Sequence, residues 1–106
     1  MSEDDFDRLL RETIIDVMTG ILGAPAVKTV FSYIQRTHLL REEDLPSNMT
    51  VFTKGLEDFF KVGAQMIEQE IVKELSAKVS AGFKPSGDFN ESIVRLREEY
   101  RSRKET

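Results

Sequence analysis

Apolar residues recur at steps of three and four along most of this chain, and no other feature constrains the fold as strongly. An α-helix has 3.6 residues per turn, so this spacing gathers apolar side chains on one face. We predict a first helix over residues 4–22, with acidic side chains near its positive N-terminal end. Its apolar stripe comprises Phe6, Leu9, Leu10, Thr13, Ile14, Val17, Met18 and Ile21.

A tight corner is predicted directly after this helix. Gly23 suits the left-handed backbone that often ends a helix, and Pro25 suits the first turn of the next one. The second helix should end near Thr37 or His38. Its inward residues are predicted to be Ala26, Val27, Val30, Phe31 and Ile34, with Tyr33 as a further candidate.

Residues 41–48 predict a surface loop in which Leu45 is an apolar anchor. Helical spacing then resumes, and Asn48 or Thr50 could cap a third helix. The apolar positions that follow are Phe52, Leu56, Phe59 and Phe60, and then Met66, Ile67, Ile71, Leu75 and Val79. One long helix or two helices would explain them. We favour a corner near Val62 and Gly63, because Gly costs about 1 kcal/mol inside a helix relative to Ala.

The C-terminal segment carries one further amphipathic pattern. Residues 82–87 predict a linker, and Asp88 with Glu91 fits a capping arrangement at the start of a helix. Its stripe of Phe89, Ile93, Leu96 and Tyr100 is too narrow to hold an isolated helix. We therefore predict that this helix packs on the acidic first helix, in its own chain or in a dimer mate.

No segment alternates apolar and polar residues for long enough to predict a strand. The fold class is therefore predicted to be all-α, a compact bundle of about four helices plus the C-terminal amphipathic helix. Three parts are expected: a helical domain over residues 1–81, a linker over 82–87 and the C-terminal helix within 88–106. The length of 106 residues suits one core.

Composition excludes several kinds of chemistry. The chain has no Cys, which excludes disulfides, thiolate metal sites and cysteine nucleophiles. His38 is the only His, and Glu42, Glu43 and Asp44 lack the spacing of a calcium loop. The glycines stand one at a time and form no phosphate-binding loop. We predict no enzyme activity, no cofactor and no metal.

The charge pattern bears on partners and location. The net charge is −4, and basic residues are interleaved with acidic ones even in the tail that holds Arg97 and Arg101. Nucleic-acid binding through this basic helix is therefore the alternative function and not the preferred one. An acidic N-terminus and the lack of a long apolar run predict a cytoplasmic protein without a membrane span.

Four stretches taken in order resemble a known family. They are Gly23-Ala24-Pro25-Ala26-Val27 opening a helix with Val30, Phe31 and Ile34; Leu45-Pro46; residues 52–56; and Phe59-Phe60 with Gly63-Ala64, Ile67-Glu68 and residues 71–75. The order is similar to the small archaeal Nitrosopumilus output domain family, fifth type, over about residues 9–79. Lys61 departs from the family pattern, which has Gly there. The resemblance implies an output or interaction role in an archaeal cytoplasm, and it brings no catalytic residues.

The leading functional hypothesis is a non-enzymatic interaction module of a signalling pathway that forms a homodimer and binds an unidentified protein. The predicted interaction residues lie on the C-terminal helix, because its stripe needs a packing surface. They are Phe89, Ile93, Leu96 and Tyr100, together with Arg97 and Arg101.

Overall fold

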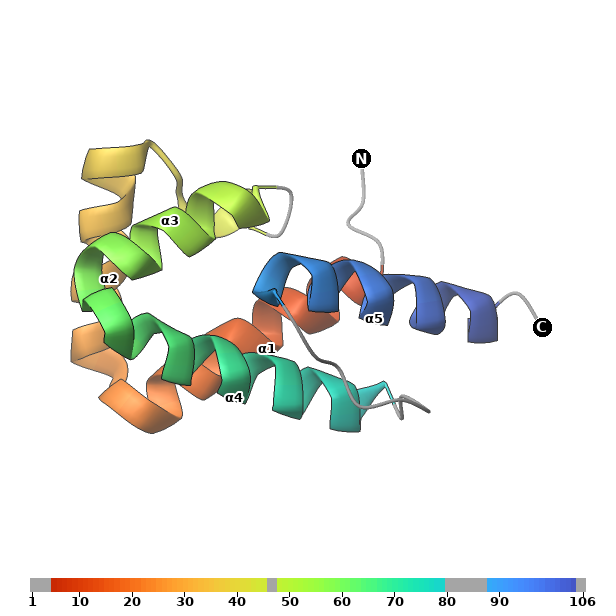
Figure 1. Ribbon diagram of the computed structural model, residues 1–106. Coiled ribbons are helices and arrows are strands. Elements are labelled where there is room, and N and C mark those ends of the chain that lie inside the picture. The colour runs from red at the N-terminus through yellow and green to blue at the C-terminus, as the bar shows by residue number, and fades with distance from the viewer. Residues whose placement is uncertain (1–4, 46–47, 80–87, 105–106) are drawn as a thin grey trace.

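The computed structural model describes residues 5–45, 48–79 and 88–104, and in these ranges every regular element is helical (Figure 1). The α-helices are α1 (Asp5–Leu22), α2 (Ala24–His38), α3 (Met49–Phe60), α4 (Ala64–Lys78) and α5 (Phe89–Lys104). Two short 3-10 helices join them, η1 (Glu42–Asp44) and η2 (Lys61–Gly63). The prediction of an all-α bundle with a C-terminal helix is confirmed.

The longest packing surface lies between α1 and α4, which run antiparallel side by side (Figure 1). Lys78 near the end of α4 contacts the Thr13 hydroxyl at 3.2 Å and forms an ion pair with Asp16 at 3.7 Å. The pair α2 and α3 closes one end of the molecule. All five helices contribute to one core, whose fully buried side chains include Phe6, Leu10, Ile14, Met18, Ile34, Phe52, Leu56, Ile67, Ile71, Leu75 and Leu96.

The corner between α1 and α2 has the predicted residues in the predicted roles. Gly23 adopts a φ of 88°, which is unfavourable for a residue with a β-carbon. Its N–H donates a hydrogen bond to the carbonyl oxygen of Thr19 at 2.8 Å and closes α1. Pro25 lies in the first turn of α2, where its missing N–H leaves no partner unsatisfied.

A corner also separates α3 from α4, close to the predicted position, but the break is at Lys61 and Gly63 itself is right-handed helical. Lys61 has a φ of 55° and a ψ of −128°, so the helical path breaks there and resumes through η2. The predicted side-chain cap of α3 is wrong. Asn48 lies at the capping position with a ψ of 49° and makes no capping hydrogen bond, and Thr50 lies inside the helix. The Asn48 amide donates instead to the carbonyl oxygen of Asp44 at 3.5 Å.

The loop between α2 and α3 is held by apolar anchors at both sides of η1. Leu40 and Leu45 are both buried, so the predicted anchoring role of Leu45 is confirmed. Asp44 closes η1 by accepting a hydrogen bond from the Arg41 N–H at 3.0 Å. The predicted linker at 82–87 lies outside the described residues.

Some residues assigned to inward stripes are exposed instead. Ile21, Phe59 and Met66 all have large exposed fractions. Ile21 and Phe59 lie near the ends of their helices. Met66 lies on the outer face of α4, since Ala64 and Ile67 of the same turn are buried. Periodicity therefore does not determine which apolar residues near a helix end are covered.

Candidate functional site

The C-terminal helix α5 packs on α1, α3 and α4 of its own chain. Three of the predicted interaction residues, Phe89, Ile93 and Leu96, are buried in the shared core. Asp88 caps the helix, because its Oδ2 accepts a hydrogen bond from the N–H of Glu91 at 3.2 Å. While α5 is docked, these apolar side chains contact their own chain and are closed to a partner.

The remaining predicted interaction residues lie on the same helix, and two of them, Arg97 and Tyr100, contact side chains of α1. Arg97 forms an ion pair with Asp7, and its guanidinium lies 5.0 Å from the centre of the Phe6 ring. The Tyr100 ring also packs on Phe6, with the two ring centres 5.6 Å apart. Arg101 is exposed. Part of the positive charge of the basic helix is therefore already paired with an acidic residue of α1.

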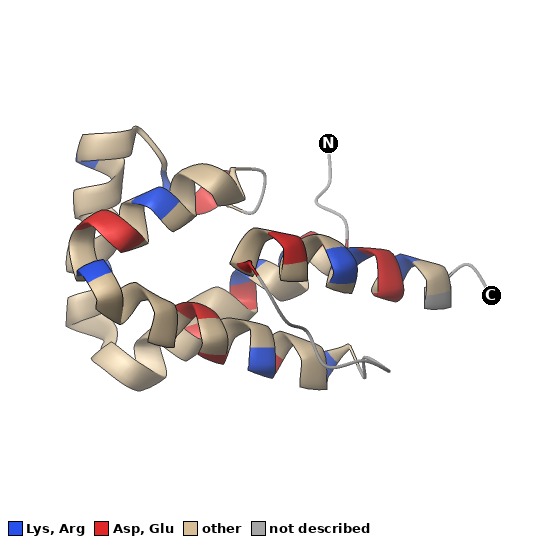
Figure 2. Ribbon diagram, viewed as in Figure 1, with Lys and Arg blue, Asp and Glu red and all other residues tan. Residues whose placement is uncertain are grey.

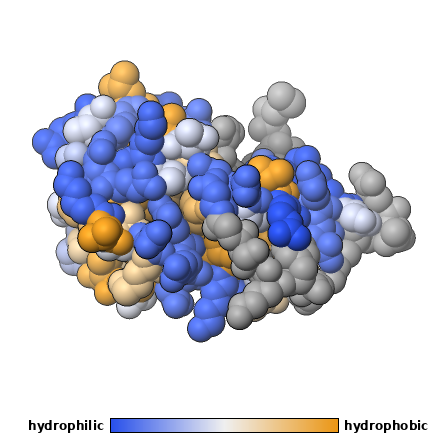
Figure 3. All heavy atoms as spheres, in the orientation of Figure 1, coloured by the Kyte–Doolittle hydropathy of each residue, from blue (hydrophilic) through white to orange (hydrophobic). Residues whose placement is uncertain are grey.

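An apolar surface lies at the other end of the molecule, where α3 turns into α4. We call it the corner patch, and it comprises Tyr33, Phe59, Phe60, Val62 and Met66. Val62 is 90% exposed and Met66 is 55% exposed. Together with Phe59 they make up half of the large hydrophobic residues that are exposed in the described part of the chain. The face in Figure 3 has an isolated hydrophobic area at this end, among hydrophilic residues.

Three aromatic rings of the corner patch contact one another in sequence. The Tyr33 ring of α2 meets the Phe59 ring of α3 edge to face at 5.1 Å, and Phe59 meets Phe60 at 4.8 Å. From Gly63 onward the backbone is right-handed helical, so Val62 and Met66 lie four residues apart on one face. Aromatic pairs of this geometry are favourable beyond the area they bury. The rings therefore hold a defined apolar surface in contact with water.

The only His of the chain lies beside this patch. His38 at the end of α2 donates a hydrogen bond from Nε2 to Oδ2 of Asp58 on α3, at 2.8 Å. The pair joins α2 to α3 at the end where Tyr33 and Phe59 meet. Sequence reasoning predicts a helix-end role for His38 and misses Asp58, because the two residues are twenty positions apart with no motif to link them.

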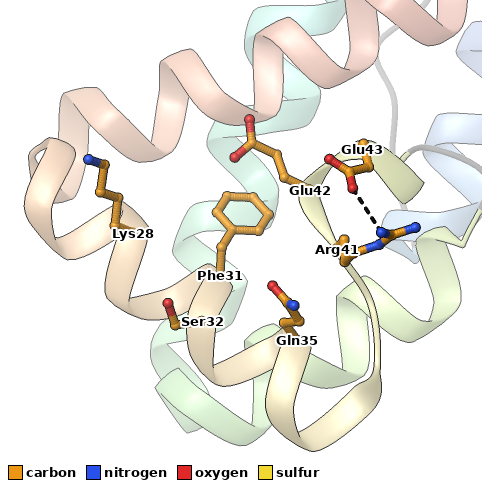
Figure 4. Close-up of a pocket in the computed structure, with 7 residues that line it drawn as sticks. All are labelled: Lys28, Phe31, Ser32, Gln35, Arg41, Glu42 and Glu43. Atoms are coloured by element: carbon orange, nitrogen blue, oxygen red, sulfur yellow. Dashed lines mark ion pairs between the residues drawn. The ribbon is translucent and has the colours of Figure 1, made fainter.

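A shallow groove of about 460 Å³ runs between α2 and η1 (Figure 4). Phe31 forms its apolar floor, and the other lining residues are Lys28, Ser32, Gln35, Arg41, Glu42 and Glu43. Figure 4 shows that Arg41 turns toward Glu43, with which it forms an ion pair at 3.3 Å. The groove thus has two basic and two acidic side chains, all exposed, and one pair is already satisfied.

The described residues contain no group of three or more His, Asp or Glu side chains arranged to hold a metal ion. One acidic residue is nevertheless unusual. Glu68 of α4 is buried, and its Oε2 has no hydrogen-bond partner within the described residues. Burial, together with the charges of Glu57 and Asp88, raises its pKa to about 7. In the sequence Glu68 stands out only as part of a resemblance, and no local pattern indicates its burial.

Comparison with known protein families, with curated proteins and with solved structures gives no match. The resemblance to the archaeal output domain family therefore stays a prediction. Within the described residues, none of the helices has the length and apolarity needed to cross a membrane.

Proposed function

We propose that this protein is a non-enzymatic interaction module that forms a homodimer through the corner patch. The exposure of Val62 and Met66 at the corner where the Tyr33 and Phe59 rings meet edge to face is the observation that carries the proposal. Apolar surface that is removed from water contributes about 25 cal/mol per Å², so such a patch favours association. The resemblance to the archaeal output domain family implies a signalling role for the same module.

The charges around the patch favour a second copy of this chain as the occupant. Asp58 and Lys61 flank Phe59 and Phe60 along the chain, and both side chains are exposed. A twofold interface is self-complementary, so an axis that passes between Asp58 and Lys61 would pair each of them with the other residue of the second copy. Opposite charges at the rim offset the repulsion between two chains of net charge −4.

Sedimentation equilibrium tests the proposal on the unmodified chain across about a hundredfold range of concentration. We expect a reversible monomer–dimer equilibrium. Val62→Glu and Met66→Glu place charges at exposed positions of the patch and should leave a folded monomer. Val94→Glu is the matched control, since Val94 is also exposed and apolar but lies on α5, and this variant should still dimerise.

Two results contradict the proposal. One is a chain that stays monomeric at every concentration. The other is a dimer that survives both patch substitutions, which would assign the interface to a different surface. Circular dichroism of each variant checks that the helical fold is retained.

The alternative, nucleic-acid binding through α5, stays a prediction, and titration with duplex DNA at two salt concentrations tests it separately.

A further inference from the structure

Glu68 lies where α3, α4 and the start of α5 come together. Its side chain is on α4, Glu57 is on α3, and Asp88 directly precedes α5. Figure 2 shows acidic positions on all three of these segments. The Glu68 residue is only 8% exposed, and its Oε2 has no hydrogen-bond partner among the described residues. A buried carboxylate normally has a donor or a cation beside it.

The first turn of α5 is the element that closes this junction. Phe89 and Ser92 are buried there, and the Thr53 hydroxyl of α3 contacts the side-chain amide of Asn90 at 3.2 Å. These contacts join the start of α5 to α3 and α4. Asp88, directly before this turn, is close enough to Glu68 for its charge to raise the pKa of the Glu68 carboxyl group.

Within residues 5–45, 48–79 and 88–104, no hydrogen bond or ion pair compensates the Oε2 of Glu68. Because α1 runs antiparallel to α4 and Asp16 pairs with Lys78, the end of α1 lies toward the first half of α4, and residues 17–22 at that end carry no charge. The basic residues of α3, η2 and α4 are Lys54, Lys61, Lys73 and Lys78. The first three are exposed, and Lys78 forms an ion pair with Asp16. On α5, Glu91 and Arg95 are exposed as well.

We propose that Glu68 is a pH-sensitive switch for the docking of α5. With a neutral carboxyl group, the first turn of α5 packs over Glu68. Once the carboxyl group has lost its proton, the buried charge and its repulsion from Glu57 and Asp88 favour release of α5 from α3 and α4. Release exposes Phe89, Ile93 and Leu96, the apolar stripe that docking covers.

The direction of the effect follows from proton linkage. In the docked state the pKa of Glu68 is raised to about 7 by desolvation, Glu57 and Asp88, whereas its usual value is 4.5. A released α5 returns the pKa toward that usual value, so release sheds a proton and becomes more favourable as pH rises. If release returned the pKa of Glu68 fully to 4.5, the population with α5 released would increase by at most several tens of fold between about pH 5 and about pH 8. The proposal does not depend on whether the chain dimerises.

Amide hydrogen exchange across this pH range, corrected for the intrinsic exchange rates, measures the opening of α5 directly. We expect protection of the α5 amides to fall as pH rises, by up to several tens of fold, while protection in α1 and α2 changes much less. Glu68→Gln keeps the shape of the side chain without its charge and should remove this fall. Glu74→Gln, an exposed position of the same helix, is the matched control and should behave as the unmodified chain does.

Thiol labelling gives a second readout, because the chain has no Cys of its own. Ser92→Cys places a thiol at a buried position of α5, and Ser102→Cys places one at an exposed position of the same helix. The ratio of the two labelling rates removes most of the pH dependence of thiol ionisation. We expect this ratio to rise with pH in the Glu68 background and to stay flat after Glu68→Gln.

Three results would overturn the proposal. They are α5 protection that does not change with pH, a fall that persists in the Glu68→Gln variant, and a fall of equal size in all helices. The last would assign the effect of Glu68 to global unfolding and not to α5.

Discussion

Gly55 of α3 lies directly against Ile34 of α2. A β-carbon at position 55 would approach Cγ1 of Ile34 to 2.8 Å and two further Ile34 carbons to 3.1 Å. Real side chains do not come so close, and Ile34 is fully buried among its neighbours. The close crossing of α2 and α3 therefore depends on the absence of a side chain at this position.

We expect overpacking in the Gly55→Ala variant to cost about 1–3 kcal/mol, because it forces side chains and backbone of a tight core to shift. The gain of up to about 1 kcal/mol that Ala brings inside a helix offsets part of this cost, so the expected net loss of stability is up to about 2 kcal/mol. Urea unfolding followed by circular dichroism measures the change in the free energy of unfolding.

Gly20→Ala is the matched control. Gly20 lies inside α1 and is exposed, and a β-carbon at this position would meet no other group within 4 Å. Here only the helix preference acts, so we expect the free energy of unfolding to rise by up to about 1 kcal/mol. If both substitutions stabilise the chain equally, α2 and α3 do not cross as closely as described.

The contrast between these two glycines shows what can and cannot be predicted from the sequence. The corner between α1 and α2 follows from local chemistry, because Gly23 and Pro25 act on their own backbone. The break between α3 and α4 lies at Lys61, whose residue type does not indicate a positive φ. Gly20 and Gly55 look alike in the sequence, since each interrupts an apolar helical pattern. Only the crossing of α2 and α3 distinguishes them, and that contact joins residues far apart in the chain.

The candidate sites also depend on contacts between residues that are far apart in the chain. The C-terminal stripe is predicted to need a packing surface, and α5 has one in its own chain. Of the corner patch, Phe59, Phe60 and Met66 are predicted as positions of an inward stripe, whereas Val62 is predicted only as part of the corner. Burial of Glu68 is not predicted, since a Glu among Gln and Glu residues usually indicates a solvated face.

Leu96 is the central apolar residue of α5 and is fully buried. We expect Leu96→Ala to lower the free energy of unfolding by about 2–5 kcal/mol, through lost burial and a residual cavity. Amides of α5 should lose more protection from hydrogen exchange than amides of α1–α4, because the other helices keep most of their shared core.

Val94→Ala gives the reference for this measurement. Val94 is 52% exposed on the same helix, so its truncation should change the free energy of unfolding by less than about 0.5 kcal/mol. Equal losses of protection in every helix of the Leu96→Ala variant would mean that α5 and the other helices unfold only together.

Arg97 contributes to the docking of α5 through Asp7 and the Phe6 ring. We expect Arg97→Ala to destabilise the protein by about 1–2 kcal/mol, since a partly buried charge-assisted hydrogen bond and a cation–π contact are lost together. Lys54→Ala, at an exposed position of α3, should stay within about 0.5 kcal/mol of the unmodified chain. Equal effects of the two variants in urea unfolding would contradict the described role of Arg97.

Glu68 should also leave a signature in the pH dependence of global stability. Its pKa in the folded chain is raised to about 7 from the usual 4.5, so the folded state holds a proton that the unfolded state has released between these values. The folded state is therefore favoured below about pH 4.5, loses this advantage as the pH rises to about 7, and changes no further above it. The full difference is roughly 3 kcal/mol at most.

Other carboxyl groups of the chain titrate over the same acidic range, so the informative quantity is the difference between the unmodified protein and Glu68→Gln. We expect this difference in the free energy of unfolding to grow in favour of Glu68→Gln from about pH 5 to about pH 7 and then to stay constant. Urea unfolding at closely spaced pH values measures it. A difference that does not vary with pH would show that Glu68 is solvated in the folded chain, and it would remove the physical basis for the pH-sensitive docking of α5.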